Sequence, residues 1–420
     1  MDERAVVTCF LRHEGAVLLL RRSEAVGSYR GQWGGVAGHA EGDPAAAARQ
    51  EIREETGLDP DRDVTLVRRG EPFTVEDDER GTRWVVHPFL FDAATREVTV
   101  DWETAAYEWV APTAILHRET VPDLWTSYDR VRPTVDTVAS DREHGAAYIS
   151  VRALEVLRDE AALVAVDGND TDGGWSRVAE TARALLAARP SMSVVRNRVN
   201  CVMHVASEAR TASAVEHTAA TAIEQAVTAD RRAAECAAER IAGQRVATFS
   251  RSGTVLTALE PGHPEAVLVA ESNPGREGVD VAERLAGSTD VTLAGDAGLA
   301  HALAEWDADA LLVGADTVLA DGRVVNKVGT RGAAIAASFE GIDVYVVAAA
   351  DKLSPDGHID LEPRAPEELY DGEAALTVLN PTFDVTPPDC IDAVVTERGV
   401  LDAPAVKELA GQHRSHADWE

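Results

Sequence analysis

The stretch GHAEGDPAAAARQEIREETGL, residues 38–58, decides the fold of the N-terminal part of this 420-residue chain. Asp43 is a favourable helix N-cap, and Pro44 suits the first helical position. Gly57 suits the left-handed residue that commonly follows the last helical turn. The stretch therefore predicts a helix that begins at Pro44 and stops before Gly57, with a glycine-rich loop in front of it.

Three glutamates share one face of this helix. Glu51, Glu54 and Glu55 stand at positions i, i+3 and i+4, which places their carboxylates close together. Like charges at this spacing repel, and the repulsion grows when they are drawn into a cleft. Carboxylate oxygens favour Mg²⁺ or Mn²⁺, which also bridge to substrate phosphates. The alternative is a solvated helix with a charged face, and the glycine-rich loop and the two helix-end signals argue against it.

These residues resemble the Nudix hydrolase signature, in which a glycine and a glutamate-containing loop precede an Arg-Glu-apolar-x-Glu-Glu-x-Gly-apolar string. The resemblance covers about residues 4–117. It implies an α/β/α sandwich around a mixed sheet, and Mg²⁺-dependent hydrolysis of a nucleoside diphosphate derivative. It also implies Glu54 and Glu55 as the principal metal ligands, Glu51 as a ligand or base, and Gly38 as the residue that shapes the loop.

Two features depart from the Nudix pattern. The loop between Glu41 and Pro44 is about two residues shorter, and Gln50 occupies the family's arginine position. Gln50 can form hydrogen bonds but carries no charge, and Arg49 lies about 100° away around the helix. Glu103 is either an additional base on a loop or an exposed acid in an acidic protein. The departures leave a dormant Nudix domain in a regulatory protein as an alternative.

The charge of the chain excludes some partners. Asp and Glu outnumber Lys and Arg by 72 to 40, for a formal net charge of −32. Such a chain repels polyanions, so no nucleic-acid partner is expected. The acidity is spread along the sequence and arginine replaces nearly all lysine, which is typical of proteins adapted to high intracellular salt.

We expect a cytoplasmic protein with no membrane partner. No stretch approaches the ~20 apolar residues of a membrane span, and the first residues, MDERAVVTCF, lack the apolar core of a signal peptide. The scattered cysteines form no metal-binding spacing and are expected to be reduced. They are Cys9, Cys201, Cys236 and Cys390.

The periodicity predicts three domains, at residues 1–117, 118–243 and 244–415. The first begins with a hairpin, and β-type runs follow its helix around residues 64–67, 84–91 and 98–100. The second has helical periodicity and abundant alanine. In the third, six short apolar strands alternate with helices, which predicts a doubly wound parallel sheet with ligands at the carboxyl ends of the strands. The expected strands are 246–249, 266–270, 291–294, 310–313, 344–350 and 391–395.

Polar motifs follow two of these strands. Ser250, Arg251 and Ser252 lie between a strand and a helix, where backbone N–H groups and the positive helix end can receive a phosphate. Lys327 is one of only three lysines, which indicates a required cationic donor, although a lysine persisting by chance is the alternative. Arg189, on the helical segment, is either a phosphate contact or a partner in a surface salt bridge.

Together with five further sequence segments, these motifs resemble the translation initiation factor 2B alpha/beta/delta subunit family. The resemblance extends from about residue 125 to residue 410. The further segments are Asp141–Ala146, Glu271–Pro274, Gly314–Asp316, Asn326–Thr330 and Asn380–Pro387. The family includes isomerases of ribose 1,5-bisphosphate and methylthioribose 1-phosphate. Its members have a helical part and a Rossmann-like part, and commonly dimerise through the latter.

The resemblance carries over to individual residues. Asp316 matches the isomerases' catalytic aspartate, and Asn326 and Lys327 match their substrate-binding pair. The isomerases' cysteine falls on Ser250, and Asn273 replaces an arginine. A serine hydroxyl does not exchange a proton at neutral pH without a strong base nearby, unlike a thiol with a pKa of ~8.5.

The leading hypothesis is an active Nudix hydrolase joined to a unit that binds a phosphorylated sugar or nucleotide and forms a homodimer or higher homo-oligomer. One alternative is a translation-associated regulatory protein with a dormant Nudix domain. Another is a ribose-1,5-bisphosphate isomerase-like enzyme that uses Asp316, with Ser250 in an altered role.

Overall fold

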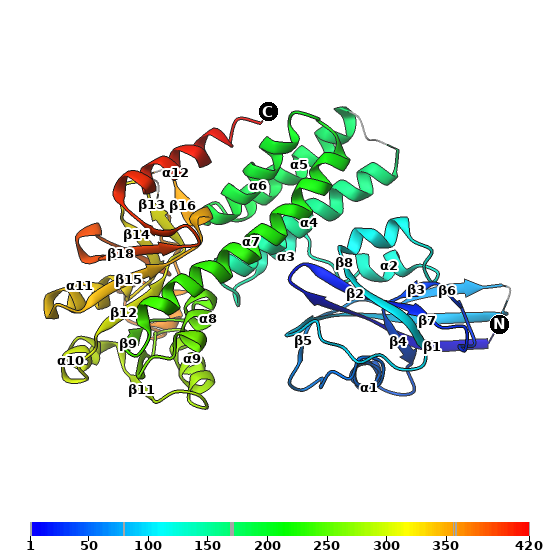
Figure 1. Cartoon of the computed structure of the whole chain (residues 1–420), viewed down its shortest axis with the longest axis horizontal. Helices are drawn as coiled ribbons and strands as arrows, with labels where there is room; N and C mark the ends of the chain where they lie inside the picture. Colours follow the sequence, from blue (N-terminus) through cyan, green and yellow to red (C-terminus); the bar gives the residue numbers. More distant parts are fainter. Residues whose placement is uncertain (1, 79, 169–171, 356, 358, 420) are drawn as a thin grey trace. The chain divides into compact units, whose positions relative to one another are not determined.

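The chain forms two compact units. The structure, a computed structural model, describes residues 2–78, 80–168, 172–355, 357 and 359–419 (Figure 1). Unit 1 contains Met1–Thr134 and Glu155–Trp175, and unit 2 contains Val135–Leu154 and Ser176–Glu420. Within the described residues, none of the helices has both the length and the apolar character that crossing a membrane requires.

Unit 1 is built on a mixed eight-stranded sheet. Its central strand β1 pairs in parallel with β7 and antiparallel with β2 and β4. The strands are β1 (Asp2–His13), β2 (Ala16–Arg22), β3 (Trp33–Gly34), β4 (Val36–His39), β5 (Val64–Arg69), β6 (Phe73–Asp77), β7 (Thr82–Ala93) and β8 (Thr104–Val110). The helices are α1 (Pro44–Thr56), η1 (Pro112–His117) and α2 (Leu124–Asp129).

Alternation along the strands gives this sheet two apolar faces. Val7, Cys9 and Leu11 of β1 pack with Ile52 of α1, whereas the intervening Phe10 belongs to the cluster that contains α2. Figure 1 shows α1 and α2 on opposite sides of the sheet. The predicted α/β/α sandwich with a mixed sheet is confirmed.

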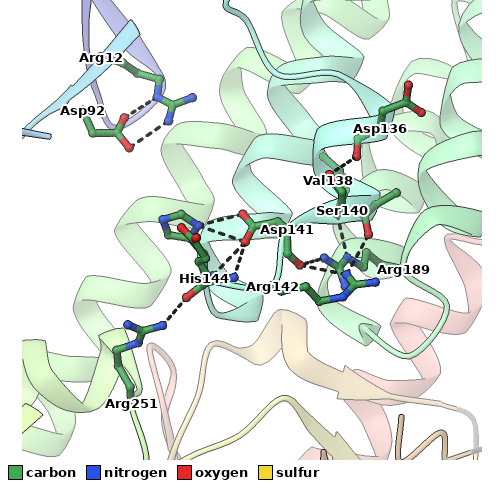
Figure 2. A network of polar contacts seen from close by, with 12 residues as sticks. Arg12, Asp92, Asp136, Val138, Ser140, Asp141, Arg142, His144, Arg189 and Arg251 are labelled. Carbon is green, nitrogen blue, oxygen red and sulfur yellow. Dashed lines mark hydrogen bonds and ion pairs between the residues drawn. The ribbon is translucent and has the colours of Figure 1, made fainter. Parts of the chain in front are cut away.

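A buried charge network joins the sheet of unit 1 to the second half of α4 (Ala146–Val166). Arg12 of β1 donates to both carboxylate oxygens of Asp92, at 2.7 and 3.0 Å, and to Glu155 at 3.2 Å (Figure 2 shows the Arg12–Asp92 pair). Arg158 donates to the carbonyl oxygen of Gly15 at 2.9 Å. Because Glu155 and the Arg12 side chain are almost fully buried, each depends on its partners for compensation.

Unit 2 begins with helices and continues as a doubly wound sheet. The first helices are α3 (Val135–Ser140), the first half of α4, α5 (Asp172–Ala188), α6 (Ser193–Ala206) and α7 (Ala212–Ile241). The first residues of α5 belong to unit 1, which includes Glu155–Trp175. The sheet order is β11-β10-β9-β12-β15-β18-β19, and all neighbours are parallel except the edge pair β18–β19. Its strands are β9 (Arg245–Thr248), β10 (Ala266–Ala270), β11 (Val291–Ala294), β12 (Ala310–Gly314), β15 (Asp343–Val347), β18 (Ala393–Thr396) and β19 (Gly399–Leu401).

Helices cover both faces of the parallel sheet. The cluster on one face includes residues of α7, α8 (Gly253–Gly262) and α9 (Glu277–Leu285). The cluster on the other face includes residues of α10 (Leu299–Glu305), α11 (Thr330–Glu340) and α12 (Ala403–Ser415). The predicted doubly wound parallel sheet is confirmed. Short 3₁₀ turns complete the unit at η2 (Asp296–Gly298), η3 (Ala350–Lys352), η4 (Pro366–Glu368) and η5 (Pro388–Cys390).

Two details of the strand prediction are wrong. The run at 98–100 is not a strand; it follows the end of α1, and Thr99 donates its N–H to the carbonyl of Thr56 at 2.8 Å. A second, four-stranded sheet in unit 2 was not predicted, because its strands have only two to four residues. They are β13 (Thr317–Leu319), β14 (Val324–Lys327), β16 (Leu353–Ser354) and β17 (Phe383–Thr386).

We predict that Glu155→Ala destabilises unit 1 by about 3 kcal/mol or more, since it removes one carboxylate from the buried Arg12. The matched control is Glu235→Ala, which breaks an exposed pair with Arg231 at 3.8 Å and should cost less than about 1 kcal/mol. Urea midpoints in high KCl measure both variants. Equal midpoints for the two variants would contradict the role of the buried network.

Candidate functional sites

Helix α1 presents its glutamates as the sequence predicts. Asp43 accepts a hydrogen bond from the N–H of Ala45 at 3.2 Å, and Gly57 follows the helix with φ of 70°. Along the helix, Glu55 is buried, Glu51 is intermediate and Glu54 is exposed. The exposure of the three side chains therefore increases from Glu55, in the core of unit 1, through Glu51 to Glu54 in solvent.

Strand β4 lies directly against two of these carboxylates. The N–H of Ala37 donates to Glu55 Oε2 at 3.3 Å. A Cβ added at Gly38 would lie 1.9 Å from Glu51 Oε1, so only glycine leaves room for that carboxylate. The structure thus brings Gly38 and the glutamate face together.

Burial and neighbouring charges raise the pKa values of two of these carboxyl groups. Burial, followed by the charge of Glu51, raises the pKa of Glu55 to about 8, while the Ala37 N–H and the charge of Arg22 oppose the shift. Burial, followed by the charges of Glu54 and Glu103, raises the pKa of Glu51. A raised carboxyl pKa means that negative charge is disfavoured there, and a bound cation would remove that cost.

Gln50, at the family's arginine position, and its neighbour Arg49 both form hydrogen bonds. Gln50 donates to Glu54 Oε1 at 2.9 Å. Arg49 instead donates to the carbonyl of Pro60 and to Asp61, both at 2.8 Å, and so points away from the glutamates. Gln50 therefore keeps a hydrogen-bonding role beside Glu54 but adds no charge.

The donor set of α1 suits a hard divalent cation. It consists of carboxylate oxygens at helical spacing, two of them with raised pKa values. Within the described part of the chain, no three Asp, Glu, His or Cys side chains are arranged as a ready-made metal site. The exposed Glu54 side chain, held by Gln50, would have to turn toward the other two to complete one.

The second candidate site lies at the carboxyl ends of β9 and β12. Ser250, in the left-handed region with φ of 63°, donates its N–H to Ser272 Oγ at 2.7 Å. Ser252 caps α8 by accepting from the N–H of Val255. A Cβ at Gly314 would lie 2.6 Å from Ser252 Oγ, so the two loops are in direct contact.

Asp316 follows β12 in the same region. Burial raises the pKa of its carboxyl, whereas the charges of Lys352 and Lys327 act in the opposite direction. Lys352 is buried and donates to the carbonyl of Ala315 at 2.7 Å. Lys327 forms an ion pair with Glu277 at 2.9 Å. Asp316 is thus a partly buried acid with two of the chain's three lysines acting on it.

The other predicted residues have structural partners. Asn326, on β14, donates to Thr330 Oγ1 at 3.0 Å. Arg189 is buried and donates to the carbonyls of Val138, at 2.8 Å, and Asp141, and Arg251 donates to the carbonyl of Glu143 (Figure 2). Both arginines therefore hold the segment between α3 and α4.

The segment between α3 and α4 is also stabilised by hydrogen bonds within itself. Asp141 accepts hydrogen bonds from the backbone N–H groups of Glu143 and His144, and its carboxylate contacts His144 Nδ1 at 2.9 Å (Figure 2). These bonds, led by those from the two N–H groups against the effect of burial, keep the pKa of Asp141 below its usual value. Arg189 and Arg251 thus contact a folded loop.

Sequence reasoning missed Arg22 at the first site, and Lys352 and Glu277 at the second. Lys352 carried a usable signal, because lysine is so rare in this chain. Arg22 and Glu277 carried none, since arginine and glutamate are common and their positions depend on how the strands pair.

Two family models match the chain. One, described as the NUDIX domain, matches residues 1–131, and the other, described as the initiation factor 2 subunit family, matches residues 142–403. The second match spans more than half of the chain. The protein belongs to the initiation factor 2 subunit family. It carries a NUDIX domain in front of the family region, so the recognition of both parts from sequence is confirmed.

Curated relatives of this initiation factor 2 family protein include sugar-phosphate isomerases. It is 33% identical over 314 residues to ribose 1,5-bisphosphate isomerase of Haloferax volcanii, covering 68% of this chain and 96% of that protein. It is 36% identical over 169 residues to methylthioribose-1-phosphate isomerase of Xylella fastidiosa, covering 37% and 48%. The relatives include proteins of halophiles, as the acidic composition indicated.

Solved structures share the fold of this region. The translation initiation factor eIF-2B of Pyrococcus horikoshii aligns with a TM-score of 0.54 and 24% identity, covering 64% of this chain and 94% of that one. The 5-methylthioribose 1-phosphate isomerase of the same organism aligns with a TM-score of 0.53 and 22% identity, covering 67% and 86%. At this identity the likeness is one of fold.

We predict that Gly38→Ala displaces the Glu51 carboxylate, because the new Cβ would occupy its place. Glu51 is flexible and can swing aside, so the melting temperature without metal should change little. The affinity for Mg²⁺ should fall roughly 10- to 100-fold, as when a group that orients a metal ligand is lost. Calorimetric titration measures it, with Gly287→Ala, where nothing lies within 4 Å of the added Cβ, as the control. An unchanged affinity would contradict the role of Gly38.

Proposed function

We propose that the NUDIX domain hydrolyses a nucleoside diphosphate derivative with Mg²⁺ or Mn²⁺. The observation that carries the proposal is the glutamate face of α1 against β4, where the Ala37 N–H donates to Glu55 and only glycine at position 38 leaves room for the Glu51 carboxylate. The match to the NUDIX domain supports it. We further propose that the rest of the chain binds a phosphorylated sugar or nucleotide and forms a homodimer or higher homo-oligomer in the cytoplasm.

The three glutamates of α1 would have different roles in such a hydrolysis. Glu54 and Glu55 would hold the ion, and Glu51 would serve as a ligand or as the base. The bound ion would screen the diphosphate and lower the pKa of an attacking water. Glu55, with a pKa of about 8, must lose its proton to bind the ion, and the Ala37 N–H holds its carboxylate in place as it does so.

The first alternative, a regulatory protein with a dormant NUDIX domain, rests on the same helix. Gln50 keeps a hydrogen bond to Glu54 but supplies no positive charge where the Nudix pattern has arginine. If that charge is indispensable, the glutamate face binds metal without turnover. Hydrolysis measurements therefore separate the two functions.

The direct test is a substrate panel of dinucleoside polyphosphates, ADP-ribose, NADH and nucleoside triphosphates, assayed with Mg²⁺ in molar KCl. We predict Mg²⁺-dependent release of two phosphoryl-bearing products. Glu54→Gln should lower kcat more than about 100-fold, the upper end for loss of a group that merely orients a ligand. The control Glu224→Gln, on the exposed part of α7, should keep the wild-type rate. Turnover that survives Glu54→Gln would overturn the proposal.

A second candidate function is isomerisation of a sugar bisphosphate in unit 2. The partly buried Asp316, on which the charges of Lys352 and Lys327 act, favours it, as does the similarity to ribose 1,5-bisphosphate isomerase of Haloferax volcanii. Ser250 argues against it, because its hydroxyl cannot exchange a proton at neutral pH without a strong base. We therefore propose that this site binds a phosphorylated sugar or nucleotide without isomerising it.

We predict that ribose 1,5-bisphosphate raises the melting temperature of the wild-type chain but yields no ribulose bisphosphate. Ser250→Cys should gain measurable isomerisation, since a thiol can exchange the proton. Ser288→Cys, on an exposed loop, is the control and should gain none. Wild-type turnover that Asp316→Asn abolishes would instead make the protein an isomerase, and the absence of any thermal shift would exclude this ligand.

A further inference from the structure

Helix α4 belongs to both units of the chain. Its first half lies in unit 2, and its second half, which begins at Glu155, lies in unit 1. The helix is continuous across this boundary, and every residue from 153 to 159 is buried. An uninterrupted α-helix of 21 residues is about 30 Å long, and its length is fixed by its own hydrogen bonds. A displacement of one end of α4 is therefore carried to the other end.

The first end of α4 is held by the second candidate site. Arg251, in the loop of residues 250–252 that is expected to receive a phosphate, donates to the carbonyl of Glu143 (Figure 2). The next residue, His144, stacks on Tyr148 in the first turn of α4, with ring centroids 4.0 Å apart. The Arg251 side chain is 42% exposed, and its ion pair with Asp280 is long, at 3.7 Å. Arg251 is thus free to turn toward a ligand, and it holds the start of α4 while it does not.

The second end of α4 is fixed to unit 1 by buried charges. Glu155 accepts a hydrogen bond from Arg12 of β1 at 3.2 Å. Asp159 accepts from the Tyr128 hydroxyl at 3.3 Å and pairs with Arg158 at 2.8 Å. Because these groups are almost fully removed from water, a lost partner is not replaced by solvent. Movement of this half of α4 therefore either moves β1 or breaks the network.

Strand β1 connects Arg12 to the glutamates of α1. Four residues before Arg12, Thr8 lies opposite Ala37 of β4 in the antiparallel pair. The N–H of Ala37 is the group that donates to Glu55. The position of β1 thus determines where this N–H lies relative to the glutamate face.

We propose that a phosphorylated ligand at residues 250–252 lowers the metal affinity of the NUDIX domain through α4. A hydrogen bond from a guanidinium to a phosphate is stronger than one to a neutral carbonyl, because both groups are charged. The ligand therefore draws Arg251 away from the carbonyl of Glu143. With that end released, α4 holds Arg12 and β1 less firmly, and the Ala37 N–H is less fixed beside Glu55.

This regulation rests on both proposed functions, the metal site of unit 1 and phosphate binding in unit 2. The effector is a phosphorylated sugar or nucleotide, which is also the class of compound that hydrolysis of a nucleoside diphosphate derivative releases. The second site then makes the NUDIX domain subject to inhibition by the class of its own products.

Calorimetric titration of the full chain with Mg²⁺ in molar KCl, with and without saturating ribose 1,5-bisphosphate, measures the effect. Binding of Mg²⁺ by the bisphosphate alone is measured without protein and subtracted. The ligand should lower the Mg²⁺ affinity about fivefold or more, the lower end of typical allosteric effects, and Mg²⁺ should lower the affinity for the ligand by the same factor. A ligand that raises the melting temperature but leaves the Mg²⁺ affinity unchanged would overturn the proposal.

Arg251→Ala releases the start of α4 without any ligand. It should lower the Mg²⁺ affinity by a similar factor, and ribose 1,5-bisphosphate should then have no further effect. Arg284→Ala is the matched control, because it breaks another exposed ion pair of unit 2, between Arg284 of α9 and Glu260 of α8 at 3.0 Å. It should keep the wild-type Mg²⁺ affinity. Equal affinities in the two variants would contradict the role of Arg251.

Hydrogen exchange in the full chain follows α4 without metal or turnover. Ribose 1,5-bisphosphate, or Arg251→Ala, should speed exchange of the backbone amides in residues 155–166 and in β1. If the wild-type chain binds no Mg²⁺, the proposed hydrolase function fails, and faster exchange in these residues would still support the connection through α4. If the bisphosphate gives no thermal shift, that ligand fails, and Arg251→Ala compared with Arg284→Ala decides. Faster exchange confined to unit 2 would overturn the proposal in either case.

Discussion

Burial of carboxylates at one end of unit 1, together with their mutual repulsion, is the constraint on which the N-terminal site depends. Glu55 is buried, Glu51 is partly buried, and Asp101 and Glu103 add their charges from a neighbouring loop. Against them the structure sets the N–H of Ala37 and the charge of Arg22. These do not offset the cost of burial and the charge of Glu51, which together raise the pKa of Glu55 to about 8. A divalent cation and its diphosphate ligand would complete the charge balance.

The parts of this site that are local in sequence could be predicted, and the parts that depend on strand pairing could not. Helical spacing alone places Glu51, Glu54 and Glu55 on one face, and the Asp43 and Gly57 signals set the ends of α1. Arg22 acts on Glu55 from the end of β2, a strand far from α1 in sequence whose position depends on strand pairing. Likewise, the apolar run at 98–100 has β character but lies along the end of α1, and strands as short as β16 leave no periodicity to detect.

The two proposed activities have a common chemistry. Hydrolysis of a compound such as ADP-ribose would release a sugar phosphate and a nucleoside monophosphate, and the second site is proposed to bind one of these classes. We propose that Lys352 and Lys327 attract a phosphorylated ligand and that the serine at position 250 favours its retention over its conversion. On this hypothesis the initiation factor 2 family region responds to what the NUDIX domain produces.

The most direct measurement of the central claim is the number of protons released when Mg²⁺ binds. Calorimetry in buffers of different ionisation enthalpy gives this number. Because the pKa of Glu55 is about 8, that residue is mostly protonated at pH 7, and binding there should release close to one proton. The release should fall toward zero by about pH 9.5, where the carboxylate is already ionised. Binding of Mg²⁺ at pH 7 without proton release would contradict the account, because it would mean that no protonated carboxyl group gives up its proton to the ion.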